Sequence, residues 1–167
     1  MRKDSKNVKR LFCILETCLG CKTCEIACAV EHSLSKNIFS VLKEETLPKH
    51  RVFLQASKDG PYPLQCRHCD EPACMLACMS AAIKKDPESG IVTIDKTKCV
   101  GCGICVMSCP FGALIIDKDK KISLKCDLCV ESGEPACVKA CPTSSLFFGT
   151  LEEFKEEVKK KTAKIKK

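Results

Sequence analysis

The sequence predicts an α+β fold in which short helices and β-hairpins form one small module nested inside another. Three observations support this prediction. Seventeen of the 167 residues are cysteine, a proportion that indicates a fold organised by cysteine chemistry. Leu, Ile, Val and Phe make up 42 residues, with one Tyr and no Trp, so an apolar core is expected but a thin one. The cysteines recur in groups of fixed spacing, separated by segments with strand and turn signals.

Sixteen cysteines fall into four groups of four, which we call quartets one to four. In each quartet two residues separate the first and second cysteines and three separate the third and fourth, while the middle spacing varies. The quartets are Cys18, Cys21, Cys24 and Cys28; Cys66, Cys69, Cys74 and Cys78; Cys99, Cys102, Cys105 and Cys109; and Cys126, Cys129, Cys137 and Cys141. The remaining Cys13 lies in an apolar run and is expected to be a small buried hydrophobe.

Quartets one and three have the tight spacing C-x2-C-x2-C-x3-C, and Pro110 follows quartet three, as in bacterial two-cluster ferredoxins. There, three cysteines of a quartet bind one [4Fe–4S] cluster and the fourth reaches the neighbouring cluster. Gly20, Gly101 and Gly103 lie in these loops, where a positive φ lets backbone N–H groups turn toward sulfur. Structural zinc typically uses two separated pairs of ligands. We therefore predict four [4Fe–4S] clusters, with zinc and disulfides as the alternatives.

An internal duplication is visible in the sequence and suggests an ancestral pair of quartets that was copied once. Quartets one and three share C-[LV]-G-C-x-x-C, and quartets two and four share E-P-A-C-x-x-A-C. Quartets two and three are separated by a linker that suits a compact module, so we predict an inner ferredoxin-like module over residues 61–111. Quartets one and four then form an outer module from residues 10–60 and 112–150, and residues 151–167 form a C-terminal helix with a basic tail.

In each module the fourth cysteine is expected to cross to the partner quartet. The predicted ligand sets are numbered by the quartet that supplies three members. Sets one to four are Cys18, Cys21, Cys24 and Cys141; Cys66, Cys69, Cys74 and Cys109; Cys99, Cys102, Cys105 and Cys78; and Cys126, Cys129, Cys137 and Cys28. His68 lies between two ligands and is expected to line a cluster without binding it.

The other elements follow from periodicity and turn signals. Residues 24–36 predict a helix whose apolar face holds Ile26, Ala27, Val30 and Leu34. Strands are expected at residues 51–55 and 91–95, and a hairpin at 113–116 with 121–125. Thr150 and Glu153 form a capping box that opens a C-terminal helix. Its apolar stripe, which should pack on the protein itself, is Leu151, Phe154, Val158 and Ile165.

Charge and hydropathy exclude several functions. The formal net charge is +7, yet only four residues are Arg and seven Lys lie in the last 13 residues, so we expect no nucleic-acid partner. Four clusters with their thiolates would also bring about −2 each and offset the surplus. No apolar run approaches the roughly 18 residues of a transmembrane segment, and residues 11–15 are too short for a signal peptide. The expected location is the cytoplasm, where thiols stay reduced.

The sequence resembles the four-cluster electron-transfer subunits of the dimethyl sulfoxide reductase and formate dehydrogenase type. The stretches CLGCKTCEIACAVEHS and CRHCDEPACMLACMSAAI are most similar to the carbon monoxide dehydrogenase-associated iron–sulfur protein and its relatives. The resemblance implies four [4Fe–4S] clusters, the nested pairing and a role as an electron relay. It also implies a redox-enzyme partner, such as a carbon monoxide dehydrogenase, hydrogenase, formate dehydrogenase or aldehyde oxidoreductase.

Three classes of function are compatible with iron–sulfur binding, and the sequence favours a non-catalytic electron carrier. A free-standing enzyme is disfavoured because four complete quartets leave no open iron site and no nucleotide-binding loop is present. A redox-sensing regulator is the alternative, although the chain has no recognisable DNA-reading element.

Overall fold

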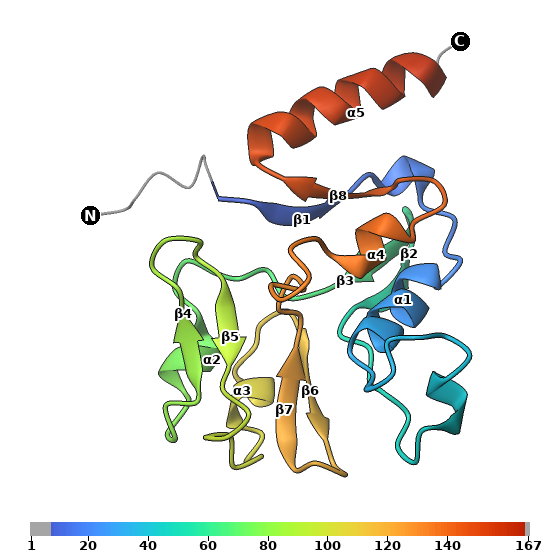
Figure 1. The fold of residues 1–167 in the computed structure, drawn as a ribbon. Coiled ribbons are helices and arrows are strands. Elements are labelled where there is room, and N and C mark those ends of the chain that lie inside the picture. Colours follow the sequence, from blue (N-terminus) through green and yellow to red (C-terminus); the bar gives the residue numbers. More distant parts are fainter. Residues whose placement is uncertain (1–7, 166–167) are drawn as a thin grey trace.

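The computed structural model describes residues 8–165, except for the side chains of Thr162, Lys164 and Ile165. It shows short helices and small antiparallel sheets, which confirms the predicted α+β class (Figure 1). The strands are β1 (Arg10–Cys13), β2 (Phe53–Ser57), β3 (Gly60–Leu64), β4 (Ile83–Lys85), β5 (Val92–Ile94), β6 (Leu114–Asp117), β7 (Ile122–Lys125) and β8 (Leu146–Gly149). The helices are α1 (Thr23–Glu31), α2 (Ala73–Leu76), α3 (Ile104–Met107), α4 (Ala136–Lys139) and α5 (Leu151–Ile165), with 3₁₀ turns at Leu15–Thr17 and Val41–Lys43.

The strands pair two by two. Three pairs, β2–β3, β4–β5 and β6–β7, join neighbours in the sequence. The fourth pair joins the two ends of the fold, because β1 lies antiparallel to β8 with Leu11 opposite Phe148. Figure 1 shows this pair beneath α5. The first and last quartets therefore follow and precede strands that are bonded to each other.

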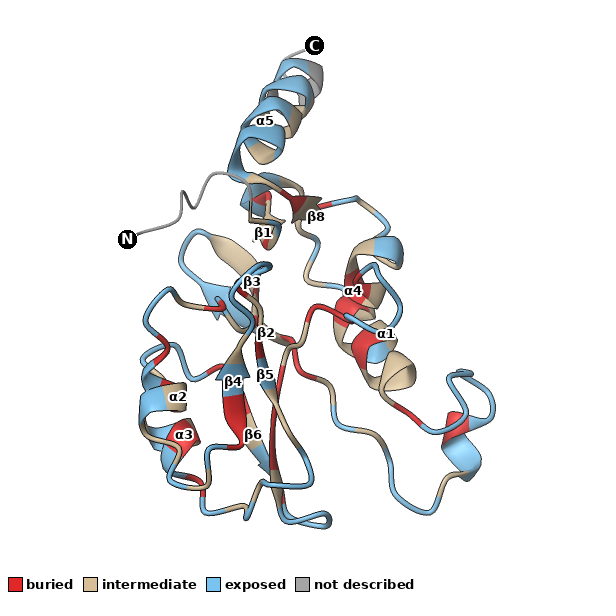
Figure 2. Ribbon diagram, turned by 60° about the vertical axis from the view of Figure 1, so that its left-hand side comes forward, coloured by how far each residue is buried: buried red, intermediate tan, exposed pale blue. Residues whose placement is uncertain are grey.

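Two apolar cores contain cysteine side chains beside aliphatic ones. The first core consists of Leu11, Cys24, Cys28, Val52, Leu128, Cys137 and Leu146. The second core consists of Cys74, Ile83, Val92, Cys105 and Leu114. Helix α1 packs against α4, and α2 packs against α3; Figure 2 shows buried residues where α1 and α4 approach each other. The cores are as thin as the composition predicts, and both are built around thiols.

The capping box at the start of α5 is confirmed. The Thr150 N–H donates to Glu153 Oε2 at 2.8 Å, and the Glu153 N–H donates to Thr150 Oγ1 at 3.3 Å. Phe154 stacks on Phe12 of β1 with ring centroids 4.6 Å apart, so the helix packs on the protein itself, as expected. Leu151 is exposed, and the Ile165 side chain lies outside the described residues.

The prediction for the first helix was wrong at its C-terminal end. Helix α1 ends at Glu31, because the Ser33 hydroxyl donates to the Val30 carbonyl at 2.6 Å and accepts from the Lys36 N–H at 2.9 Å. Such local bonds compete with helix continuation. The predicted apolar face is also wrong, since Ile26 is 52% and Leu34 89% exposed. The buried residues of α1 are Cys24 and Cys28.

The predicted strand at residues 51–55 is observed as β2, two residues later. The Arg51 N–H donates to Cys28 Sγ at 3.2 Å, so this backbone group bonds a thiol instead of a neighbouring strand. The strand predicted at 91–95 is observed as β5, and the predicted hairpin is observed as β6 and β7. Strand β4, which pairs with β5, was not predicted.

Candidate metal centres

Three cavities are each lined by four thiols, and in each cavity the thiols come from two quartets. The thiols in these cavities are Cys18, Cys21, Cys24 and Cys141; Cys66, Cys69, Cys74 and Cys109; and Cys78, Cys99, Cys102 and Cys105. All seventeen cysteines are free thiols. The structure thus brings together the members of predicted sets one, two and three around separate spaces.

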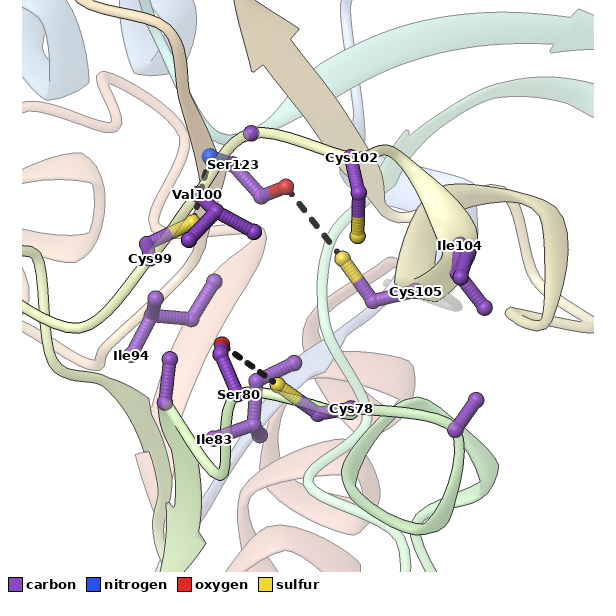
Figure 3. A pocket seen from close by; sticks show the side chains of 13 residues that line it. Cys78, Ser80, Ile83, Ile94, Cys99, Val100, Cys102, Ile104, Cys105 and Ser123 are labelled. Carbon is purple, nitrogen blue, oxygen red and sulfur yellow. Dashed lines mark hydrogen bonds between the residues drawn. The ribbon is translucent and has the colours of Figure 1, made fainter.

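The cavity of set three illustrates the arrangement. Figure 3 shows the sulfur atoms of Cys78, Cys99, Cys102 and Cys105 facing a shared space, with Cys78 approaching from the segment after α2. Ser123 of β7 supports two of them, because its N–H donates to Cys99 Sγ at 3.3 Å and its Oγ lies 3.2 Å from Cys105 Sγ. The bond that the Ser123 N–H donates favours the Cys99 sulfur in its anionic form, whereas the Cys105 thiol donates to the Ser123 hydroxyl.

Three members of set four lie in or against the first core, namely Cys28, Cys126 and Cys137, and Cys129 is also buried. The effects of these thiols on one another's pKa agree with this grouping. Burial raises the pKa of the Cys126 thiol to about 12, and Cys28 adds to this rise. Burial likewise raises the pKa of Cys129 to about 11, again with a contribution from Cys28. Burial raises the pKa of Cys137, and Cys126, Cys28 and Cys129 raise it further. Cys28 is therefore close to all three of its predicted partners in quartet four.

The loop of quartet three requires glycine at position 101. Gly101 has φ +67°, and a Cβ atom there would lie 2.3 Å from the carbonyl oxygen of Lys121. Any side chain would push the cysteine loop away from the β6–β7 hairpin. Glycine is thus needed at position 101 for two reasons: the left-handed backbone conformation of the loop, and the close approach of the loop to the Lys121 carbonyl.

The same turn follows the last cysteine of three quartets. Ala81, Gly112 and Ser144 each lie three residues after that cysteine and have φ of 51°, 63° and 51°. Each N–H donates to the carbonyl of the cysteine, at 3.1, 3.2 and 3.1 Å respectively. Quartet one differs, because α1 continues past Cys28 to Glu31. The duplication visible in the sequence therefore extends to the backbone geometry of quartets two to four.

The donor atoms fit a polynuclear iron–sulfur centre better than a single zinc ion. Zinc binds thiolates at about 2.3 Å, which keeps its sulfur ligands within roughly 4 Å of one another. Within the described residues, no three thiols of one set lie within 4.8 Å of each other. Four free thiols spread around each cavity instead suit a larger cluster, in which each thiolate reaches a different iron.

Among the described residues, one compact group of ligand-type side chains is formed by His32, Asp127 and Cys129. His32 Nε2 lies 3.2 Å from Asp127 Oδ1, and His32 Nδ1 lies 2.8 Å from the Cys28 carbonyl oxygen. Arg51 Nη1 donates to the other carboxylate oxygen of Asp127. Because a guanidinium and an imidazole already engage the carboxylate, these residues form a buried ion-pair network.

Each charged group in this network stabilises the opposite charge of its partner. Burial alone would lower the pKa of His32, but hydrogen bonds to Asp127 and Cys28 raise it to about 9. Burial opposes ionisation of Asp127, yet His32 and Arg51 hold its pKa well below the usual range. In the sequence, His32 has no ligand context. No local signal could have found it, because its partner Asp127 lies 95 residues away.

Two other predicted positions are resolved by the structure. His68 does not line the cavity of set two; its ring is buried, Nδ1 accepts the Val92 N–H at 3.0 Å, and burial lowers its pKa to about 3. Its backbone N–H donates to Cys66 Sγ at 3.4 Å, so His68 approaches set two through its backbone, while its ring bonds to β5. Cys13 is half-buried and packs against the first core, and burial raises its pKa to about 12.

These features define a ferredoxin-like iron–sulfur protein, and comparison with known proteins agrees. A family model described as a 4Fe-4S dicluster domain matches residues 61–151, and one described as a 4Fe-4S binding domain matches residues 15–31. The chain is 35% identical over 174 residues to the iron–sulfur subunit of the nitrate-inducible formate dehydrogenase of Escherichia coli (strain K12), covering 91% of this chain and 58% of that protein.

Two further relatives are matched over most of their length. An iron–sulfur protein of Rhodospirillum rubrum is 36% identical over 155 residues, covering 83% of this chain and 80% of that protein. The protein named "Probable anaerobic dimethyl sulfoxide reductase chain YnfG" of Escherichia coli (strain K12) is 36% identical over 149 residues, covering 84% and 72%. The chain belongs to the family of iron–sulfur subunits of the formate dehydrogenase and dimethyl sulfoxide reductase type.

The match to the formate dehydrogenase subunit spans little more than half of that protein. In the part of the chain that the structure describes, no helix is both long and apolar enough to cross a membrane.

Proposed function

We propose that this chain binds four [4Fe–4S] clusters and relays electrons between a catalytic redox enzyme and an acceptor. The observation that carries the proposal is the grouping of thiols from two quartets around shared cavities. Sets one to four are the proposed ligands, and the contacts of α1 with α4 and of α2 with α3 support the nested pairing of modules. Clustered free thiols suit a reducing compartment, so we place the protein in the cytoplasm.

When bound, such clusters supply one-electron transfer. The chain's own contribution is to hold the thiolates in place and to direct N–H donors at their sulfur atoms. The Ser123, Arg51 and His68 backbone N–H groups donate to Cys99, Cys28 and Cys66. Each set offers four thiols, one for each iron of a [4Fe–4S] cluster, so no iron would keep an open position for a substrate. The chain is therefore a relay and leaves the catalysis to its partner.

The partner class rests on the family resemblance. Relatives are named as subunits of a formate dehydrogenase and of a dimethyl sulfoxide reductase, and the cysteine stretches resemble the protein associated with carbon monoxide dehydrogenase. We propose carbon monoxide dehydrogenase as the first partner to test, followed by hydrogenase, formate dehydrogenase and aldehyde oxidoreductase.

The test begins with anaerobically purified protein, which should contain about 16 iron and 16 sulfide for four clusters. Its visible absorption should bleach with dithionite. Alone, the protein should oxidise no carbon monoxide, formate, hydrogen or aldehyde. With the right enzyme and substrate, the absorption should bleach at a rate set by that enzyme. Zinc without labile sulfide, turnover by the chain alone, or no reduction beside any of these enzymes would contradict the proposal.

A further inference from the structure

A lysine with a buried ammonium group lies where the two proposed modules meet. Lys125 is the last residue of β7, directly before Cys126, and is 3% exposed. Its Nζ donates to the Cys126 carbonyl at 2.8 Å and to the Val92 carbonyl of β5. Val92 belongs to the second core, whereas Cys126 packs against the first. The ammonium therefore connects a strand of the inner module to quartet four.

The charge of Lys125 has no carboxylate to balance it. In the ion pairs formed by the described residues, Lys125 takes no part. The nearby buried Arg51 is different, because Asp127 neutralises it. Burial of an unpaired charge is strongly unfavourable. Both hydrogen-bond acceptors of the Lys125 ammonium are backbone carbonyl oxygens, which carry no net charge.

Anionic sulfur would supply the missing negative charge from two sides. Val92, whose carbonyl accepts from the Lys125 ammonium, lines the cavity of set two. Cys126, whose carbonyl is the other acceptor, belongs to set four. One ammonium therefore lies between two separate proposed centres.

We propose that Lys125 is a positioning residue that stabilises the reduced state of the two proposed centres on either side of it, those of sets two and four. Each centre gains one electron from a low-potential donor and takes up no proton, so its negative charge grows by one. The Coulomb attraction between a cation and that added charge is larger in a poorly solvated interior than between the same charges in water. The consequence is a higher reduction potential at the module boundary than the same centres would have beside a neutral side chain. This inference rests on the proposed function.

The experiment compares variants of the full chain, purified anaerobically with its clusters and titrated against potential with dithionite, with paramagnetic resonance as the readout. In Lys125→Gln, which keeps a hydrogen-bond donor but no charge, two of the four midpoints should move negative. The expected shift is at least tenfold in the reduction equilibrium constant, which is 59 mV for one electron. Lys125→Arg should keep midpoints close to those of the unaltered chain.

Lys98 provides a matched control. It precedes the first cysteine of quartet three as Lys125 precedes that of quartet four, but it is exposed. Because water screens an exposed charge, Lys98→Gln should leave all four midpoints in place. A variant that moved every midpoint equally would indicate a general structural change and would overturn the proposal.

The outcomes separate this inference from the proposed function. Iron and sulfide are measured first, and an unaltered chain without them would overturn both. If the clusters are present and Lys125→Gln leaves every midpoint unchanged, only the role of Lys125 is overturned. If the neutral variant loses two clusters while Lys125→Arg keeps all four, the charge is required and the proposal stands. If Lys125→Arg fails in the same way as Lys125→Gln, the charge is not what matters and the proposal falls.

Discussion

Replacing Cys28 by alanine should remove the centre proposed for quartet four and leave the one beside Cys24 intact. Cys28 follows Cys24 by one helical turn in α1, yet only Cys24 lines the cavity of set one. The Cys28 thiol instead lies near Cys126, Cys129 and Cys137. Loss of one ligand from four should cost one cluster, so iron should fall from about 16 to about 12 per chain.

The iron count of this single variant does not distinguish crossed from local ligation, but two double variants do. If Cys28 and Cys126 serve the same cluster, replacing both should still leave about 12 iron, whereas local ligation predicts about 8. If Cys24 and Cys28 serve different clusters, replacing both should leave about 8 iron, whereas local ligation predicts about 12. Non-additivity of this kind is the signature of residues that act as one unit.

The assay is iron and labile sulfide per chain after anaerobic purification, supported by paramagnetic resonance of the reduced protein. In each double variant, the quartets without a substitution keep their full sequence. We therefore expect no loss of iron from the clusters that the two replaced cysteines do not bind. The reverse pattern, with about 8 iron for Cys28 with Cys126 and about 12 for Cys24 with Cys28, would refute the crossed arrangement.

Three further predictions test the scaffold. Gly101→Ala should lower the free energy of unfolding by about 1–2 kcal/mol because of the left-handed backbone, and by about 1–3 kcal/mol more because of the clash with the Lys121 carbonyl. Gly112 has φ +63° and open space around an added Cβ, so Gly112→Ala should show only the first cost. Anaerobic denaturant unfolding measures both variants. Thr150→Ala should cost about 1 kcal/mol through loss of the helix cap, seen in the same unfolding measurement, and an unchanged midpoint would contradict the capping role. Cys13→Ala should leave iron at about 16 per chain, and a deficit of a whole cluster would show that this thiol is a ligand.

The parts of the fold that the sequence predicted best are those with local causes. The cysteine spacing within a quartet and the turn and capping residues are patterns that extend over a few positions. These patterns predicted the cysteine groups, the β6–β7 hairpin and the cap of α5. The first helix was predicted too long because its aliphatic periodicity indicated an apolar face. In the structure, the side chain of Ser33 ends the helix, and its buried residues are the thiols of Cys24 and Cys28. Aliphatic periodicity is a weak guide where sulfur fills the core.

The charged interior could not be predicted, because its partners are distant in the sequence. Arg51 meets Asp127 across 76 residues and His32 meets it across 95. In the sequence Lys125 resembles the many other lysines, and only the packing of β5 against β7 around it reveals that it is buried. Burial of a charge depends on tertiary contacts, and a single sequence carries no period or motif for them.

The cysteine side chains in the two apolar cores link the stability of the fold to the binding of the proposed clusters. Both cores place cysteine beside Val and Leu, so the side chains that would hold the clusters also supply much of the apolar packing. Burial raises the pKa of Cys24, Cys74 and Cys129 to about 11, which means that these thiols become anionic at neutral pH only when a metal stabilises the thiolate. Metal binding must therefore displace their protons, and its free energy adds to that of folding. A chain with a thin aliphatic core depends on that contribution, since five of its thiols are buried members of the two cores and others pack against them.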